Sequence, residues 1–189
     1  SDDIYEHMTW GKAFSHLLEV APFLRDRTIS INGVSKSFSM TGWRLGWAIA
    51  HPKLCKAMKK IQSQSTSNPC SLSQIAAAEA LMSPLELIDP MRQAFEKRHS
   101  ELYTALQEHP LLDPIFSDGT FYSFVDAQAM IDHLGLKDDL ELSAYLLENH
   151  LLACVPGSAF GAPGYLRLSF AASEQNLQKA VDRLNTIGL

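Results

Sequence analysis

A lysine and an arginine lie eight residues apart in a stretch of small residues between two candidate strands. The stretch begins at Asn32 with Asn-Gly-Val-Ser-Lys and ends with Met-Thr-Gly-Trp-Arg-Leu-Gly, which places Lys36 and Arg44 within it. Small neighbours let a backbone approach a ligand closely. A desolvated lysine can lose its proton and attack a carbonyl carbon, and arginine offers a planar fork that matches a phosphate. An imine-forming lysine beside a phosphate-binding arginine is what pyridoxal phosphate requires. Taken alone, an ordinary surface lysine is the alternative interpretation of Lys36.

The elements expected around this stretch are short strands followed by a helix. Residues 28–31 form a β-prone run that the turn dipeptide Asn32-Gly33 is expected to end. Residues 43–50 are a second candidate strand, apolar enough to suggest burial on both faces. Pro52 is typical of a helix start. The predicted helix has Leu54, Ala57, Met58 and Ile61 on one face and Lys53, Lys56, Lys59 and Lys60 at other positions.

The remaining residues alternate between helices and strands. Ser71 and Gln74 fit a capping box before an alanine-rich helix over 75–82, and a long helix is expected over 91–107. Ser173 is expected to cap the last helix. The C-terminal part is therefore predicted to be α+β, with strands over 121–125, 151–155 and 166–170 and a helix over 140–147.

Composition limits the classes of function. The 189 residues include 16 Lys and Arg against 21 Asp and Glu, a net charge of −5, which argues against general nucleic-acid binding. We therefore interpret the four-lysine group as a solvated helix face. No apolar run approaches the ~20 residues that span a bilayer. The three cysteines lack disulfide or zinc spacing, as expected for reduced thiols in the cytoplasm.

The segment from Gly33 to Gly46 resembles the lysine signature of class I/II aminotransferases, which are fold-type I pyridoxal-phosphate enzymes. The form Asn-Gly-x-Ser-Lys followed by Met-Thr-Gly-Trp-Arg-x-Gly is most similar to the bacterial aspartate aminotransferase branch. Upstream, Asp-Asp-Ile-Tyr at residues 2–5 resembles the Asp-x-x-Tyr motif of the family. Residues 157–161 and 164–170 resemble its C-terminal substrate-arginine block. The resemblance covers essentially the whole chain.

The resemblance implies a role for each matching residue. Lys36 would be the Schiff-base lysine and the general base and acid that moves a proton from Cα to C4′. Asp2 would pair with the protonated pyridine nitrogen and so keep the ring an electron sink. Tyr5 would hydrogen-bond the 3′-oxygen of the ring. Arg44 would bind the 5′-phosphate, and Arg167 would hold the substrate α-carboxylate through two parallel hydrogen bonds. No metal is implied.

The resemblance also implies an organisation for the protein. The fold class would be α/β, with residues 1–90 as the end of the cofactor-binding large domain, 91–109 as a linking helix and 110–189 as the α+β small domain. Family members are about twice as long, so this chain would be the C-terminal half of a cytoplasmic homodimer. The missing half would supply the glycine-rich phosphate turn and an aromatic residue that stacks on the cofactor, and the isolated piece is expected to be inactive.

Three functions remain open at this point. The first is transamination of an L-amino acid, aspartate being the expected donor, with 2-oxoglutarate. The second is a related pyridoxal-phosphate enzyme, either an aromatic aminotransferase or a C–S lyase. The third is a folded interaction module without catalysis. Neither a nucleic acid nor a membrane is expected as a partner.

Overall fold

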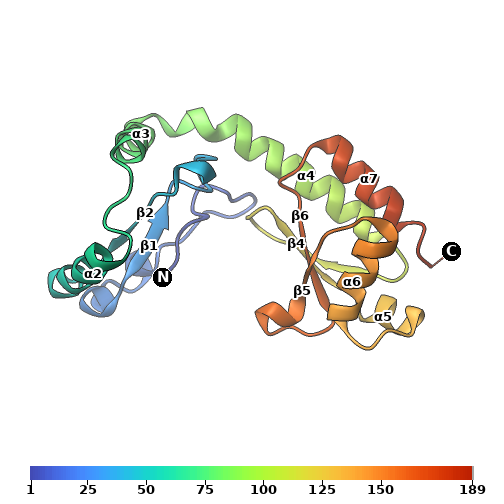
Figure 1. The fold of residues 1–189 in the computed structure, drawn as a ribbon. Helices are drawn as coiled ribbons and strands as arrows, with labels where there is room; N and C mark the ends of the chain where they lie inside the picture. The colour runs from blue at the N-terminus through green and yellow to red at the C-terminus, as the bar shows by residue number, and fades with distance from the viewer. Residues whose placement is uncertain (189) are drawn as a thin grey trace. The chain divides into compact units, whose positions relative to one another are not determined.

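The computed structural model describes residues 1–188 and divides the chain into two compact units, one of residues 1–92 and one that begins at Gln93. Figure 1 shows the order of their helices and strands. The boundary falls within helix α4 (Asp89–Gln107), the long helix that was predicted over 91–107. Each unit is described by itself.

The first unit is built around a two-stranded antiparallel sheet of β1 (Ser30–Gly33) and β2 (Gly46–Ile49). Gly33 lies opposite Gly46 in this ladder. A Cβ atom on Gly33 would lie 2.9 Å from the Leu45 carbonyl oxygen, and one on Gly46 would lie 2.9 Å from the Asn32 oxygen. The two glycines therefore let the strands approach closely. The predicted turn at Asn32-Gly33 is wrong, because pairing with β2 extends the strand through both residues.

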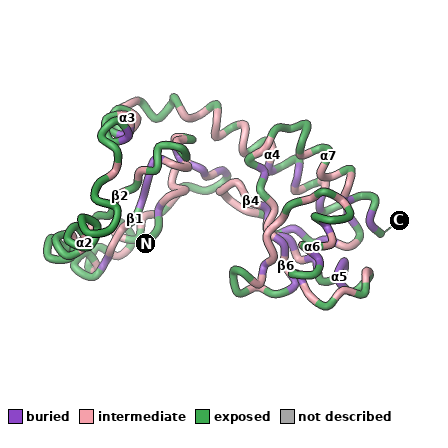
Figure 2. Tube along the Cα trace, viewed as in Figure 1, coloured by how far each residue is buried: buried purple, intermediate pink, exposed green. Residues whose placement is uncertain are grey.

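The strand predicted over residues 43–50 is also shorter than expected. It begins at Gly46, since Thr41–Trp43 form a 3₁₀ turn and Arg44 is left-handed, with φ +51°. Its residues are mostly exposed, so burial on both faces is not observed (Figure 2).

Helices make up much of the rest of this unit. The helix predicted from Pro52 is confirmed, but the capping box is wrong: Cys70 occupies the N-cap position, and Gln74 Nε2 donates to the Pro69 carbonyl. The helical segments are α1 (Leu17–Val20), η1 (Pro22–Arg27), η2 (Thr41–Trp43), α2 (Pro52–Ser65), α3 (Ser71–Met82) and η3 (Leu85–Ile88).

Much apolar surface of this unit is uncovered. Helix α2 buries none of its residues, and the apolar stripe that predicted it ends at Ile61, which is 71% exposed. Phe23 and Met82 are more than four-fifths exposed. Apolar exposure on this scale is typical of a surface that binds another part of a protein.

The second unit packs helices against a four-stranded antiparallel sheet of order β3-β4-β6-β5. In the ladder of the two central strands, Phe124 lies opposite Arg167 and Val125 opposite Leu166. The strands are β3 (Asp113–Ile115), β4 (Tyr122–Asp126), β5 (Val155–Pro156) and β6 (Tyr165–Ser169). The helical segments are α5 (Gln128–Leu134), α6 (Asp139–His150), η4 (Gly157–Phe160) and α7 (Glu174–Leu184).

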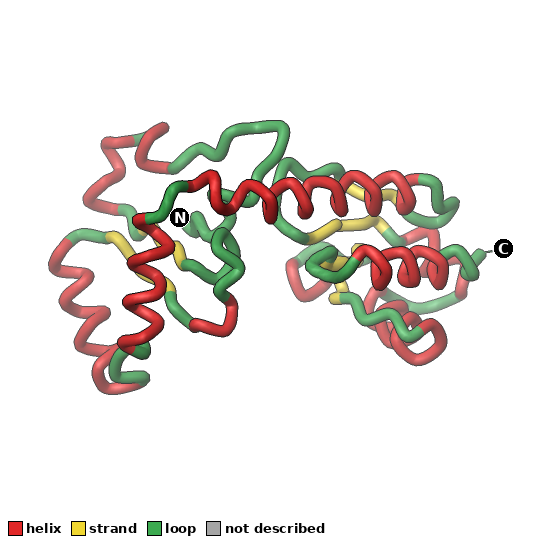
Figure 3. The backbone as a smooth tube through the Cα atoms, turned by 90° about the horizontal axis from the view of Figure 1, so that it is seen from above, coloured by secondary structure: helices red, strands yellow, loops and turns green. Residues whose placement is uncertain are grey.

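The two faces of this sheet differ in character. Val125 and Leu166 are fully buried on the face that the helices cover. Helices α4 and α7 lie side by side here (Figures 1 and 3), where Lys97 and Glu174 form an ion pair of 2.7 Å. Side chains alternate along a strand, so Arg167 lies on the opposite face.

Most of the predicted elements of the second unit are present. Ser173 caps α7 as predicted, with its hydroxyl accepting from Asn176 N. The strand predicted over 151–155 is reduced to β5, since Leu151 is instead the left-handed C-cap of α6. Strand β3 and helix α5 were not predicted.

Candidate functional site

The segment that carries Lys36 and Arg44 is the connection between β1 and β2. A main-chain hydrogen bond from Val34 N to Leu45 O, of 3.3 Å, closes it. Lys36 lies half-buried in its first turn. Arg44 lies exposed at its far end, where its Nη1 donates to the Thr41 carbonyl at 2.8 Å. Among residues 1–188 the Arg44 guanidinium forms no other hydrogen bond or ion pair, which leaves N–H groups available to an anion.

Residues 1–5 are joined to this loop by hydrogen bonds. Asp3 N donates to Ile31 O in β1 at 2.8 Å. The hydroxyl of Ser37, the residue after the predicted lysine, donates to the Ile4 carbonyl at 3.3 Å. The structure therefore joins the two segments that carry the predicted residues of the first unit, which are Asp2, Tyr5, Lys36 and Arg44.

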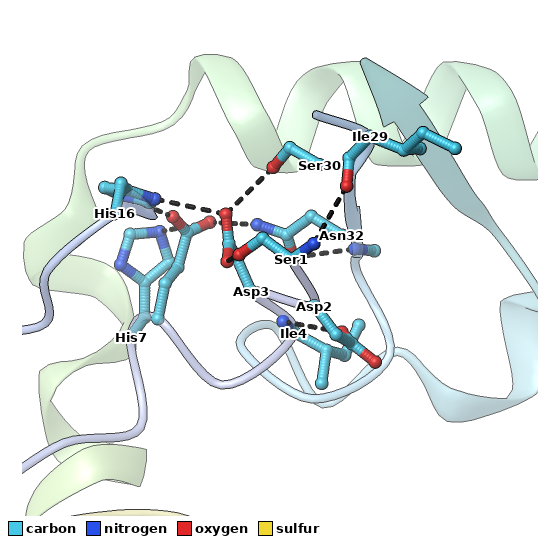
Figure 4. Close-up of polar contacts among 11 residues, drawn as sticks. Ser1, Asp2, Asp3, Ile4, His7, His16, Ile29, Ser30 and Asn32 are labelled. Atoms are coloured by element: carbon cyan, nitrogen blue, oxygen red, sulfur yellow. Dashed lines mark hydrogen bonds and ion pairs between the residues drawn. The ribbon is translucent and has the colours of Figure 1, made fainter. Parts of the chain in front are cut away.

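A polar network lies next to these residues, and the sequence analysis missed it (Figure 4). Asp3 is only 5% exposed and accepts from the Ser30 hydroxyl at 2.9 Å. His16 has Nδ1 3.3 Å from Asp3 and Nε2 3.3 Å from Glu6, and Asn32 Nδ2 donates to Glu6 at 2.6 Å. Burial raises the pKa of the Asp3 carboxyl, but the serine and His16 hydrogen bonds outweigh it, and the net pKa is lowered.

A signal for this network was present in the sequence. Asp2 and Asp3 are adjacent at the end of an extended segment, where successive side chains point to opposite sides. One of the two carboxylates therefore had to point into the protein, where it needed hydrogen-bond donors. The inward residue is Asp3, whereas Asp2, the predicted cofactor ligand, is exposed and accepts only from Ile4 N, at 3.2 Å, among the hydrogen bonds of residues 1–188.

Arg167 lies in the second unit between two aromatic rings. Its guanidinium carbon is 4.2 Å from the ring centre of Tyr122 and 4.4 Å from that of Phe160. We call these three residues the arginine clamp. Aromatic faces hold a guanidinium by cation–π contact and leave its N–H groups, which lie in its plane, for a carboxylate. Among residues 1–188, Arg167 forms no ion pair.

The functional groups of the first unit are those that pyridoxal phosphate needs. Lys36 offers an amine for the aldehyde, and Arg44, on the same closed loop, offers uncommitted N–H groups for the phosphate. Tyr5 and Asp2 offer a hydroxyl and a carboxylate for the ring oxygen and the ring nitrogen. The arginine clamp of the second unit suits a substrate carboxylate.

Residues 1–188 were compared with the requirements of a metal centre and of a membrane-spanning helix. Within residues 1–188, no three or more His, Cys, Asp or Glu side chains are grouped so that they could hold a metal ion. No helix in the same range is long and apolar enough to cross a membrane.

Comparisons with known proteins identify the family that the chain resembles. The model of the family "Aminotransferase class I and II" matches residues 1–184. The chain is 43% identical to the aspartate/prephenate aminotransferase of Nitrosomonas europaea, covering 99% of this chain and 49% of that protein. It is 42% identical to the aspartate aminotransferase of Bacillus subtilis, covering 97% of this chain and 47% of the relative. The chain thus spans about half the length of the curated relatives it matches.

Solved structures that resemble the chain are also aminotransferases, and the chain again covers about half of each. The aspartate aminotransferase of Rhizobium meliloti superimposes with a TM-score of 0.91 at 37% identity, covering 98% of this chain and 48% of that one. The aromatic aminotransferase of Pyrococcus horikoshii gives a TM-score of 0.89 at 33% identity, and the match covers 99% of this chain and 50% of that one.

Proposed function

The chain belongs to the class I and II aminotransferase family, and from this we propose an aminotransferase activity for the protein that contains it. The protein would transfer an amino group from an L-amino acid, with aspartate as the preferred donor, to 2-oxoglutarate. The family depends on pyridoxal 5′-phosphate and has the α/β fold of fold type I. The observation that carries the proposal is the closed loop with Lys36 and Arg44, hydrogen-bonded to the Asp2–Tyr5 segment.

Each residue would then have a defined task. When bound, the cofactor supplies an electron sink for the electrons left at the substrate Cα. Lys36 would hold the cofactor, and its amine would then take the proton from the substrate Cα and deliver it to the cofactor C4′ atom. Arg44 binds the phosphate, Tyr5 hydrogen-bonds the ring oxygen, and Asp2 keeps the ring nitrogen protonated. Arg167 orients the substrate by its α-carboxylate.

The proposal extends to the organisation of the whole protein. We propose that residues 1–90 complete a large cofactor-binding domain, that 91–109 link it to a small domain of residues 110–189, and that the protein is a cytoplasmic homodimer. The uncovered apolar surface of the first unit and the half-length match to the relatives support a larger assembly.

Trapping of the cofactor tests the central assignment. Borohydride converts a lysine–cofactor linkage into a stable secondary amine, which peptide mass spectrometry locates. In the whole protein we expect the label on Lys36 and its loss in Lys36→Ala. The control Lys56→Ala, on the exposed side of α2, should keep the label. A label on a different lysine, or none in the unmodified protein, would contradict the proposal.

A second substrate class has its own support. The aromatic aminotransferase among the similar structures and the prephenate named for the Nitrosomonas relative point to aromatic or prephenate-type substrates. Rates with aspartate, tyrosine, phenylalanine and a C–S lyase substrate, and with 2-oxoglutarate and prephenate as acceptors, distinguish these functions. The aspartate assignment is wrong if another donor gives the highest kcat/KM.

A further inference from the structure

Two consecutive aspartates stand at the start of α6, and only one of them caps the helix. Asp138 is the N-cap, and its Oδ1 accepts from Leu140 N at 3.1 Å and from Glu141 N at 3.0 Å. Asp139 is the first residue of the helix and is 0% exposed. A buried carboxylate is costly unless donors surround it, so its burial needs an explanation other than helix capping.

The donors come from a loop that lies far along the chain. Asp139 Oδ2 accepts from Ser158 N at 2.7 Å, and Oδ1 accepts from the Ser158 hydroxyl at 2.6 Å and from Gly164 N at 3.3 Å. Burial raises the pKa of Asp139, but these hydrogen bonds outweigh it and the net pKa is lowered. An ionised carboxylate accepts at both oxygens, which neither an amide nor a hydroxyl can do. Asp139 therefore joins both ends of the segment 158–164.

That segment forms one wall of the arginine clamp. Phe160, two residues after Ser158, places its ring 4.4 Å from the Arg167 guanidinium. Arg167 itself follows Gly164 by three residues in β6. The position of Phe160 relative to Arg167 thus depends on the fold of a short loop whose two ends are fixed by the same carboxylate.

We propose that Asp139 is a positioning residue for substrate recognition, which holds the segment 158–164 so that Phe160 and Arg167 stay in register to receive a carboxylate. The inference rests on the proposed function, because it takes the ligand of Arg167 to be the substrate α-carboxylate. Asp139 is 0% exposed, so a ligand has no access to its carboxylate. Its effect passes through the main chain of the loop to the aromatic wall of the clamp.

The test compares two neighbouring aspartates in the whole protein, with maleate as the carboxylate probe. Asp139→Asn should raise the Kd of maleate, measured by calorimetry, about tenfold, since small misplacements of binding groups are costly. Asp138→Asn, which changes the adjacent helix cap, should leave that Kd unchanged. Ser158→Ala removes one of the three hydrogen bonds and should give a smaller rise in the same direction. Kinetically, Asp139→Asn should raise KM more than it lowers kcat, with cofactor trapping on Lys36 unchanged.

A double-mutant cycle separates positioning from general stability. If Asp139 acts through Phe160, adding Asp139→Asn to Phe160→Leu should weaken maleate binding little further. Additive losses would overturn the proposal, as would equal effects of the two Asp→Asn variants. Phenylglyoxal labelling of Arg167, read by peptide mass spectrometry, gives a signal independent of activity. The label should form faster in Asp139→Asn than in Asp138→Asn.

The outcomes distinguish this inference from the proposed function. Maleate binding that is lost in Arg167→Ala but unchanged in Asp139→Asn would overturn the positioning role alone. A protein without transamination that still shows the Arg167-dependent and Asp139-dependent binding would overturn the proposed function alone. Unchanged maleate affinity in Arg167→Ala would overturn the carboxylate role of Arg167 and the positioning role together.

Discussion

Gly157 begins the loop that carries Phe160, and its replacement by alanine should be strongly destabilising. An added Cβ would lie 2.2 Å from the Ala162 carbonyl oxygen, 2.6 Å from Tyr165 Cβ and 2.8 Å from the Tyr165 oxygen. These are backbone or Cβ atoms, which cannot rotate away as a side-chain tip can. The Ala162 carbonyl would have to move by more than about 1 Å to reach ordinary contact. We expect a loss of about 3 kcal/mol in the free energy of unfolding of the second unit.

The same loop supplies the matched control. Gly161 has a left-handed backbone with φ +76°, but a Cβ there would meet no atom within 4 Å. Gly161→Ala therefore carries only the conformational cost of a left-handed alanine, about 1 kcal/mol. The difference between the two variants isolates the steric effect from the general effect of replacing a glycine.

Hydrogen exchange is the suitable assay. The three tryptophans, Trp10, Trp43 and Trp47, all lie in the first unit, so their fluorescence does not report on the second. Exchange of the β6 amides, followed by mass spectrometry over a urea series, measures the opening of the sheet that carries the clamp. The reasoning is refuted if Gly157→Ala opens β6 no more easily than Gly161→Ala does.

Three further predictions concern other parts of the chain. The pKa of Asp139 in the folded protein lies below the usual 3.8, so its ionisation stabilises the fold fully above pH 3.8. This stabilisation is lost as the pH falls through the pKa of the folded state. The free energy of urea unfolding, measured at several acid pH values, should therefore depend less on pH in Asp139→Asn. The Cys70 thiol is exposed and backbone N–H groups lower its pKa, whereas burial raises the pKa of the Cys154 thiol. Iodoacetamide should therefore alkylate Cys70 before Cys154, as followed by peptide mass mapping. Ser173→Ala removes the cap of α7 and should cost about 1 kcal/mol, with faster exchange of the first α7 amides.

Local signals in the sequence predicted the helices well and the strands less well. The proline of α2 and the serine cap of α7 act within one helical turn, so both were predictable. Asn32-Gly33 is a strong turn signal by itself, yet pairing with Trp47 and Gly46 draws the two residues into β1. The apolar content of residues 43–50 suggested a buried strand, but their exposure depends on what covers β2, which periodicity cannot show.

The polar network beside the candidate site was harder to predict than the candidate site residues themselves. Lys36 and Arg44 share one short segment, so their spacing allowed a joint task, and the family resemblance then favoured that task over an ordinary surface lysine. Glu6 and Asn32 are separated by 26 residues, and they come to 2.6 Å where residues 1–3 pair with Ile31 of β1. Such contacts depend on tertiary folding and leave no spacing pattern in the sequence.

The arginine clamp depends on the register of the sheet. Arg167 lies opposite Phe124 in the ladder of β4 and β6, which puts Tyr122 on the same face two residues away. A slip of one residue would turn Arg167 into the apolar core, so the burial of Leu166 and Val125 fixes the face on which the guanidinium lies. Phe160 is not in this ladder, so the sheet alone cannot place it. The buried carboxylate of Asp139 meets this need, because it joins the loop of Phe160 to the helix that packs beside β5 and β6.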